Sequence, residues 1–428
     1  MTRKAIFLTA VIAVLVVSTV NAETIAIING NIVVGNGTVI ENGTLLIEDG
    51  LIKAVGANVE VPDGATLIDA GGMRVLPGFI DPCTTVGMVE VRAAQMTDDT
   101  NEATLTATPH MRAGDAINPD SSVIPVTRNA GITTVLVVPG NSNPINGQAA
   151  VINLCGRTVD EMLLADGVAQ VFNLTQRAQR RDSYPSTRMG VFAFVRQTLY
   201  DARSYAEQSA KPASSEDEEG QSGEERKQPR KRDLAMEALI PVLKGDVPVI
   251  AEARTIQEIR AALAIAKEFN LRMILLNSAH AYKMLDEIKQ SGYPVLLGTT
   301  FSVPGDTEPY DCYYSLAAKI HEAGIPFAFT TGSAHSVRNL AEHASMAVAY
   351  GLPPAAALEA LTIRPAEILG IADKVGTLEP GKIANVAIFD GCPLQIKSKV
   401  VRLIINGKDI PLVSRQEMLR DKFEDIEK

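Results

Sequence analysis

Thiol, carboxylate and imidazole side chains follow short apolar runs of this chain. Cys83 and Thr85 come directly after the segment VLPGFIDP, residues 75–82. Glu252 follows a second apolar run, and His335 follows a third. Cysteine, glutamate and histidine are common ligands of zinc-like ions, and a thiol within hydrogen-bond reach of an imidazole can act as a nucleophile. Cys83, Glu252 and His335 are therefore one candidate metal or nucleophile site.

Two β-rich ends surround a middle in which strands and helices alternate. Residues 23–75 and 376–412 contain short β-type runs between tight turns, which predicts one composite β-sandwich built from both termini. Residues 76–375 alternate continuous apolar runs with helical patterns, which is typical of a parallel sheet covered on both faces. We therefore expect an α/β fold, a (β/α)8 TIM-like barrel with the composite sandwich attached. Residues 413–428 form a C-terminal tail in this interpretation.

Residues 207–232 interrupt the barrel pattern. An acidic stretch, SSEDEE, precedes a basic one, RKQPRKR, and large apolar side chains are absent from the segment. Such a composition buries too little apolar surface to offset the entropy lost on ordering the chain. We expect a disordered charged insert, which is either a tolerated surface insertion or a functional segment, namely a tether for a partner or a protease-sensitive lid.

Composition excludes some partners. The 428 residues carry a net charge of −10, and an acidic surface disfavours nucleic-acid backbones and anionic membranes. The cysteines form no Cys-x-x-Cys pair, so no zinc ribbon is present. We expect buried free thiols and leave any disulfide pairing open. The four cysteines are Cys83, Cys155, Cys312 and Cys392.

Residues 1–22 have the pattern of an export signal. Arg3 and Lys4 precede an apolar run, and small residues end at Ala22 before Glu23. The apolar run at residues 5–20 is shorter than the roughly 20 residues that span a bilayer. We expect cleavage of the signal, a mature protein without a stable membrane span, and a periplasmic or secreted location.

An ordered series of motifs runs along most of the chain. It begins with PGFID at residues 77–81, continues through NEAT, AINP, GITTV and PSTRMG, and ends with ALTIRPAEILG at 360–370 and GTLEPGKIAN at 376–385. These motifs resemble the amidohydrolase superfamily, in particular its imidazolonepropionase-related branch. The resemblance implies a barrel with a composite sandwich and the hydrolysis of non-peptide C–N bonds in cyclic or linear amides. The family's divalent metal, such as zinc, lowers the pKa of bound water and polarises the carbonyl group under attack.

The resemblance also shows that the family's metal ligands are replaced here. Family members carry a His-x-His pair on the first strand, a histidine on each of two later strands and an aspartate on the last. Those positions fall on Cys83, Thr85, Glu252, Asn277 and Ser333. Threonine and serine are poor zinc ligands and asparagine is a weak one, so we expect no metal cofactor and assign no catalytic residue. Without a metal ion, Glu252 needs polar contacts from Arg254, Asn277 or Ser333.

The remaining titratable candidates have simpler interpretations. His321 and His343 lie in helical patterns and are interpreted as surface or packing residues. His110 follows a loop motif and is a candidate for the barrel mouth, while His280 is expected to begin a helix just after Asn277. Asp81 is expected to be structural.

Two functions are consistent with this sequence. The first is a catalytically impaired amidohydrolase that still binds a small amide-like ligand. The second is a non-catalytic relative, a pseudoenzyme that binds a ligand, forms a homo-oligomer or pairs with an active homologue. Fold resemblance alone does not choose between them.

The export interpretation makes a direct prediction. Protein recovered from outside the cytoplasm should begin at Glu23, because the small residues ending at Ala22 form the cleavage site. N-terminal sequencing measures this. Soluble cytoplasmic protein that retains Met1 would contradict it.

Overall fold

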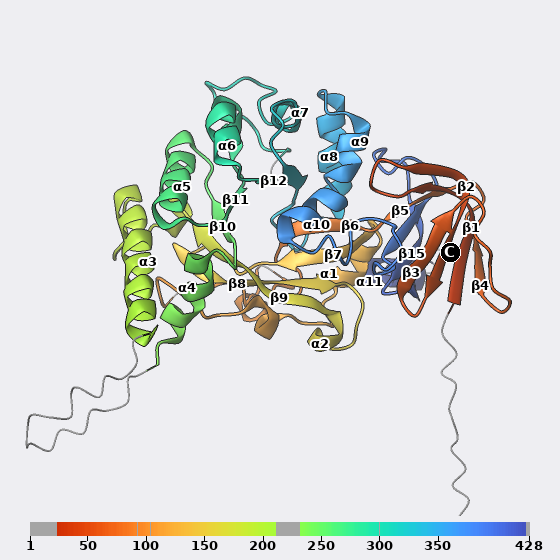
Figure 1. The fold of residues 1–428 in the computed structure, drawn as a ribbon, viewed down its shortest axis with the longest axis horizontal. Coiled ribbons are helices and arrows are strands. Elements are labelled where there is room, and N and C mark those ends of the chain that lie inside the picture. The colour runs from red at the N-terminus through yellow and green to blue at the C-terminus, as the bar shows by residue number, and fades with distance from the viewer. Residues whose placement is uncertain (1–23, 92, 103, 211–231, 299, 425–428) are drawn as a thin grey trace, which may run out of the picture.

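The chain forms a helix-covered barrel and a smaller β domain beside it (Figure 1). The predicted export signal and residues 211–231 of the predicted insert lie outside the described residues. Residues 207–210 of that insert instead belong to the last turn of helix α3 (Arg188–Ala210). The computed structural model describes residues 24–91, 93–102, 104–210, 232–298 and 300–424.

Both ends of the chain build the β domain, which confirms the predicted composite architecture. Strand β5 pairs antiparallel with β14, with Pro77 opposite Val386 and Arg74 opposite Phe389. The sheet order is β16-β15-β14-β5-β1-β2-β3, and β4 pairs with β1. The strands are β1 (Thr24–Val33), β2 (Val39–Glu48), β3 (Leu51–Gly56), β4 (Thr66–Asp69), β5 (Arg74–Pro77), β14 (Val386–Phe389), β15 (Val400–Ile405) and β16 (Lys408–Ile410).

Two tight turns from distant parts of the sequence meet in this domain. Asp49-Gly50 joins β2 to β3 and Asn406-Gly407 joins β15 to β16, and all four residues have positive φ angles. Such dipeptides favour the turns that match the twist of a β-hairpin. A Cβ atom on Gly407 would lie 2.4 Å from Cα of Gly50, so the contact between the turns requires glycine.

The second body is a nearly closed eight-stranded barrel. Its sheet order is β13-β12-β11-β10-β9-β8-β7-β6. At the seam between the first and last strands, the amide of Gly332 donates to the carbonyl of Cys83 at 3.0 Å. The predicted TIM-like fold class is confirmed. The strands are β6 (Phe79–Thr84), β7 (Ile132–Val137), β8 (Ile145–Asn153), β9 (Leu163–Asn173), β10 (Val249–Glu252), β11 (Met273–Leu276), β12 (Val295–Leu297) and β13 (Phe327–Phe329).

One strand departs from the expected parallel order. Strand β8 is antiparallel to both of its neighbours, β7 and β9. The link from β7 to β8, residues 138–144, is too short for the crossover of a dozen or more residues that parallel strands need. The sheet is therefore a modified barrel. Strand β8 follows β7 as a hairpin, without a helix between them, and runs in the opposite direction.

Helices cover the outside of the barrel. Helix α5 begins with a capping box formed by Thr255 and Glu258 and ends at Asn270, whose φ is positive. The predicted C-terminal tail contains helix α11. The α-helices are α1 (Val123–Arg128), α2 (Val159–Met162), α3 (Arg188–Ala210), α4 (Leu234–Lys244), α5 (Ile256–Phe269), α6 (Leu285–Ser291), α7 (Leu316–Glu322), α8 (Leu340–Ala349), α9 (Pro354–Glu359), α10 (Ile363–Leu369) and α11 (Arg415–Glu424).

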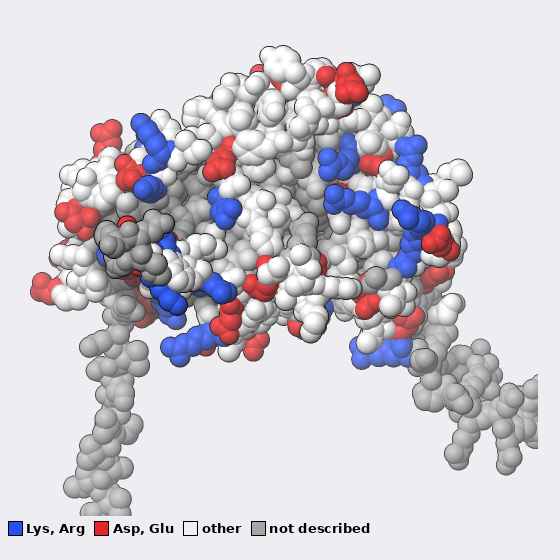
Figure 2. All heavy atoms as spheres, turned by 180° about the vertical axis from the view of Figure 1, so that it is seen from behind, with Lys and Arg blue, Asp and Glu red and all other residues white. Residues whose placement is uncertain are grey.

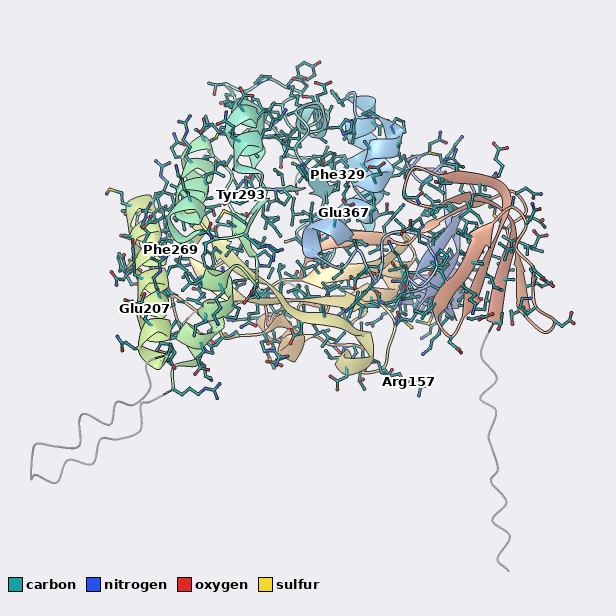
Figure 3. All side chains as sticks on the ribbon, in the orientation of Figure 1. Arg157, Glu207, Phe269, Tyr293, Phe329 and Glu367 are labelled. Atoms are coloured by element: carbon teal, nitrogen blue, oxygen red, sulfur yellow. The ribbon has the colours of Figure 1, made fainter. Side chains whose placement is uncertain are left out.

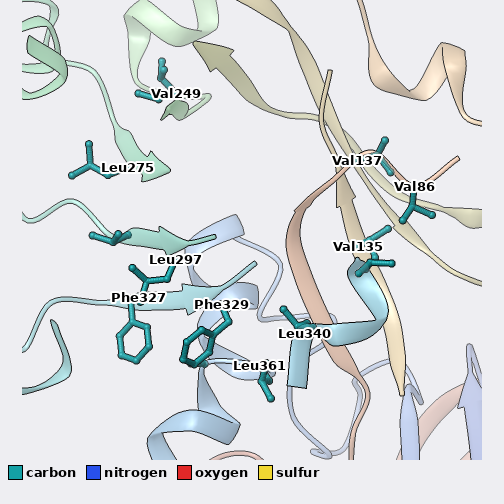
Figure 4. Packing of buried hydrophobic residues seen from close by; sticks show 14 of the residues in the cluster. Val86, Val135, Val137, Val249, Leu275, Leu297, Phe327, Phe329, Leu340 and Leu361 are labelled. Carbon is teal, nitrogen blue, oxygen red and sulfur yellow. The ribbon is translucent and has the colours of Figure 1, made fainter. Parts of the chain in front are cut away.

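Alternation along the barrel strands separates two buried layers. Outward side chains such as Leu275 and Phe327 belong to the cluster under the helices (Figure 4). Inward side chains such as Ile274 and Ala328 belong to a separate cluster that also contains Cys83. Successive residues of a strand point to opposite faces, so Cys83 faces the interior near the C-terminal end of β6, the end of the barrel at which ligands bind.

Other connections hold the outer layer in place. The hydroxyl of Tyr293 donates to the carbonyl of Leu271 at 3.2 Å, which ties the start of β12 to the start of β11. Tyr293, Phe269 and Phe329 can be followed across the barrel domain in Figure 3. All four cysteines are free thiols; Cys83, Cys155 and Cys312 are buried as expected, whereas Cys392 is half-buried.

Two surface properties bear on partners. None of the described helices is long and apolar enough to cross a membrane. Acidic and basic side chains are interspersed over the face shown in Figure 2. The expectation that the protein binds no nucleic acid stays a prediction.

Phe389 links the two bodies and supplies a test of their coupling. Its ring is 4% exposed, lies 5.5 Å from that of Phe79 on β6 and packs against Gly131. Phe389→Ala should lower the free energy of unfolding by about 3–5 kcal/mol, measured by urea denaturation, because it leaves a cavity. Phe423→Ala on α11, where the ring is 50% exposed, is the matched control and should change stability by less than about 0.5 kcal/mol. Equal effects of the two variants would contradict this account.

Candidate functional site

A cavity of about 230 Å³ opens at the carboxyl ends of the barrel strands. Four of the six residues singled out from the sequence line it, namely Cys83, Thr85, Glu252 and Asn277. They come from the ends of β6, β10 and β11, which meet at one mouth because these strands are parallel. The structure therefore brings together four of the five positions that were placed by family resemblance, and Ser333 does not line the cavity.

Glu252 is the central buried charge of this mouth. Its side chain ends β10 and is only 3% exposed. One carboxylate oxygen accepts a hydrogen bond from Nδ2 of Asn141 at 2.6 Å, and the other accepts one from Nδ2 of Asn277 at 3.3 Å. The expected contact with Asn277 is present, whereas Asn141 replaces Arg254 and Ser333 as the second partner. Glu252 forms no ion pair with any described residue.

Backbone geometry fixes Asn277 in place. Its φ of 56° lies in the left-handed region, which asparagine tolerates better than most residues. A Cβ atom on Gly298 would lie 1.7 Å from its Oδ1, so the residue directly after β12 must be glycine. Oδ1 is buried without a protein partner beside a cavity of about 20 Å³, which is large enough for one water molecule. The amide nitrogen therefore faces Glu252 and the oxygen faces away.

Cys83 is a buried thiol rather than an activated nucleophile. Its side chain is 3% exposed. Burial raises the pKa of the thiol well above its usual value, and the negative charges of Asp81 and Glu252 raise it further. Only a thiolate is strongly nucleophilic or binds metal, so this environment suits neither role.

Asp81 closes the barrel beneath the mouth. Its buried carboxylate accepts hydrogen bonds from the hydroxyl groups of Thr330 at 2.5 Å and Thr331 at 2.6 Å, and from the amides of Thr331 and Cys83 at 3.2 Å. Burial nevertheless raises the pKa of Asp81 to about 6. These bonds join β6 to the loop after β13, which is a structural role.

Ser333 and His335 form hydrogen bonds in and around the turn after β13. The hydroxyl oxygen of Ser333 accepts hydrogen bonds from the amides of His335 and Ser336, both at 3.2 Å. His335 is exposed, and its Nε2 lies 2.9 Å from the carbonyl oxygen of Glu90. Its ring is therefore bound elsewhere than to Cys83 and Glu252.

The chemistry of the donor set does not fit a catalytic metal ion. Among the described residues, no group of three histidine, cysteine, aspartate or glutamate side chains is arranged to hold one. Glu252 already accepts two amide hydrogen bonds, and Cys83 is held as a neutral thiol. A structural zinc site needs four ligands and a catalytic one commonly has three from the protein.

Sequence reasoning missed part of this site. Asn141 binds Glu252, and Asp98, Asn101 and Arg177 also line the cavity. Asn141 follows the apolar run that became β7, so its position just after a strand was the available signal. Asn101 lies in the NEAT motif, and its side-chain oxygen accepts a hydrogen bond from the amide of Ser142 at 3.0 Å.

The other histidines lie around the site rather than in it. His321 is exposed, and His110 is half-buried. Nε2 of His280 lies 2.7 Å from the carboxylate of Glu308, which also accepts a hydrogen bond from the hydroxyl of Tyr313 at 2.8 Å. These contacts anchor the loop after β12 over the barrel.

His343 lies beside a second cavity, of about 500 Å³, near the ends of β12 and β13. The residue is 7% exposed, and its ring centroid lies 4.7 Å from that of Phe301. Burial lowers the pKa of His343 to about 4, so the imidazole is neutral at physiological pH. This environment agrees with the interpretation of His343 as a packing residue.

Comparisons with known proteins agree with this architecture. The model of the amidohydrolase family matches residues 314–410. The amidohydrolase tasK of Hapsidospora irregularis is 28% identical over 395 residues, which are 85% of this chain and 39% of that protein. A crystal structure of an amidohydrolase from Thermotoga maritima superposes with a TM-score of 0.82 at 28% identity, covering 91% of this chain and all of the other.

Shorter similarities point the same way. A 5-methylthioadenosine/S-adenosylhomocysteine deaminase from Pyrococcus furiosus is 44% identical over 64 residues, 15% of each chain. The chain belongs to the amidohydrolase superfamily of hydrolases. It spans about two fifths of the length of the tasK protein. The imidazolonepropionase-related branch stays a prediction.

The buried imidazole of His343 predicts a pH effect on stability. Its folded-state pKa, about 4, lies below the unfolded value near 6.5, so the unfolded chain binds the additional proton. The stability from neutral burial is present above about pH 6.5 and is lost as the pH falls towards 4, at a cost of about 3 kcal/mol. His343→Gln should remove this component from urea denaturation measured across that window. His321→Gln on α7 is the exposed control, and equal pH slopes for wild type and His343→Gln would contradict the assignment.

Proposed function

We propose that this protein has lost the metal-dependent hydrolysis of its superfamily and retains the barrel mouth as a binding site for a small ligand. The reaction of the family, hydrolysis of non-peptide C–N bonds, is impaired or absent in this proposal. The observation that carries it is the pair of amide hydrogen bonds from Asn141 and Asn277 to the carboxylate of Glu252. These bonds occupy the position that the family resemblance assigns to a metal-binding histidine.

The loss of the metal removes two sources of catalysis together. A metal ion generates hydroxide from bound water and stabilises the charge that develops on the carbonyl oxygen. The remaining groups supply neither effect, because Glu252 and Asp81 are negative and the thiol of Cys83 is neutral. The position of the family's aspartate is occupied by Ser333. Its hydroxyl oxygen accepts hydrogen bonds from backbone amides of its own turn.

A pairing function is the second candidate. Its support is the occupied carboxylate of Glu252, which accepts two amide hydrogen bonds in place of metal bonds. A partner subunit, such as an active homologue, would then carry the catalytic metal. Co-purification from the native source tests this candidate, and recovery of the chain only as a monomer or homo-oligomer would contradict it.

Export belongs to the proposal as well. The support is the basic start, the short apolar run and the small residues ending at Ala22. The location that this pattern favours is periplasmic or secreted.

Metal content tests the central part of the proposal. Protein purified without chelators should contain well under one equivalent of zinc, manganese or iron by elemental analysis, and chelators should leave its melting temperature unchanged. A variant with the family's set, Cys83→His, Thr85→His, Glu252→His, Asn277→His and Ser333→Asp, is the matched control for metal uptake. One equivalent of metal in the wild type, lost together with amide hydrolysis in Glu252→Ala, would contradict the proposal.

A further inference from the structure

We propose that the cavity at the barrel mouth binds a small organic cation, a ligand whose ammonium or amidinium group donates hydrogen bonds to Glu252. This inference rests on the proposed metal-free site and names the class of ligand that the site takes. It concerns the sign of the buried charge at the cavity, which is negative here and positive where a metal ion is bound.

The first step is the unbalanced charge of Glu252. A buried charge is costly unless it is paired, and its side chain is 3% exposed. The two groups that bind it, the amides of Asn141 and Asn277, are neutral. A carboxylate has about four acceptor positions, so capacity for further donors remains. A cationic ligand would complete both the charge balance and the hydrogen bonding.

The second step is the rest of the lining. Asp98 contributes another carboxylate to the cavity wall, and Asp81 lies just behind Cys83. Arg177 also lines the cavity, but it is exposed and forms no ion pair with Glu252. Solvent screens an exposed guanidinium much more than it screens a buried carboxylate. The buried carboxylate of Glu252 is therefore the least screened of the charges that line the cavity.

The third step separates an organic cation from a metal ion. The side-chain amides of Asn141 and Asn277 both contact Glu252 through their nitrogen atoms. Their oxygen atoms are therefore not arranged to bind the same metal ion as the carboxylate. A metal ion would have Glu252 and a neutral thiol as its nearest donors, too few for a stable site. An ammonium or amidinium group needs only acceptors at hydrogen-bond distance.

The same polarity disfavours the family's mode of substrate binding. A metal ion attracts the carbonyl oxygen of an amide, whereas the carboxylate of Glu252 repels it. The cavity of about 230 Å³ is also smaller than the roughly 300–1,000 Å³ of pockets that take drug-sized ligands. A compact cation is therefore the best fit.

A matched pair of small probes tests this inference on the folded chain. Methylguanidinium and methylurea have nearly the same shape but differ in charge, and acetate supplies the opposite charge. Ligand-observed NMR titration should show methylguanidinium binding at least about tenfold more tightly than methylurea, a difference of about 1.4 kcal/mol, with no binding of acetate. The preference should weaken as salt is added, because its origin is electrostatic.

Glu252→Gln is the matching variant, since it keeps the shape of the side chain and removes the charge. It should abolish the preference for methylguanidinium. Glu287→Gln, on the surface of α6, is the control and should leave the preference unchanged. If Glu252→Gln fails to fold, the wild-type comparison and its salt dependence still decide the matter.

Two results would overturn the inference, and they differ in what they mean for the proposed function. Equal binding of methylguanidinium and methylurea by metal-free wild type overturns the ligand class alone. Displacement of methylguanidinium by one equivalent of zinc overturns both the ligand class and the metal-free site.

Discussion

The barrel depends on the hydrogen bonds that the buried carboxylate of Asp81 accepts across its seam. The sheet runs from β6 to β13, and these terminal strands meet where hydroxyl and amide groups of Thr330 and Thr331 bind this carboxylate. A buried carboxylate is tolerated because it has several donors. The same bonds place Cys83 beside the loop after β13 and so define one side of the mouth.

A second buried carboxylate, that of Glu252, places a negative charge at the mouth. Glu252 lies on β10 and is held by amides from the ends of β7 and β11, across the top of the barrel. Burial raises the pKa of the Cys83 thiol, and the negative charges of Asp81 and Glu252 raise it further. The superfamily scaffold is therefore preserved, while the electrostatics at its centre are opposite to those around a metal cation.

Much of this architecture could be predicted from the sequence, because apolar runs and turn dipeptides report directly on buried strands and hairpins. The tight turns expected in residues 23–75 and 376–412 include Asp49-Gly50 and Asn406-Gly407, and the continuous apolar runs of the middle became barrel strands such as β10 and β11. The antiparallel strand β8 was missed because Asn146, Gln148 and Asn153 interrupt its apolar pattern. These polar residues are accommodated by specific hydrogen bonds, such as Asn153 Oδ1 with the hydroxyl of Thr134 at 2.7 Å, which a pattern cannot reveal.

The site, too, could be predicted from the sequence only in part. Family resemblance placed Cys83, Glu252 and Asn277 together, whereas Asn141 was missed because its role depends on how the link from β7 to β8 folds back over the mouth. His335 was proposed as a partner because it follows an apolar run, but its ring binds the carbonyl of Glu90 instead. Side-chain direction in loops is set by such tertiary contacts and not by local sequence.

A crystal structure of protein grown with excess zinc, measured by anomalous scattering at the zinc edge, tests the central claim most directly. The account predicts no anomalous peak at the mouth, with the amides of Asn141 and Asn277 still bound to the carboxylate of Glu252. A zinc peak about 2.0–2.2 Å from a carboxylate oxygen of Glu252 would contradict it.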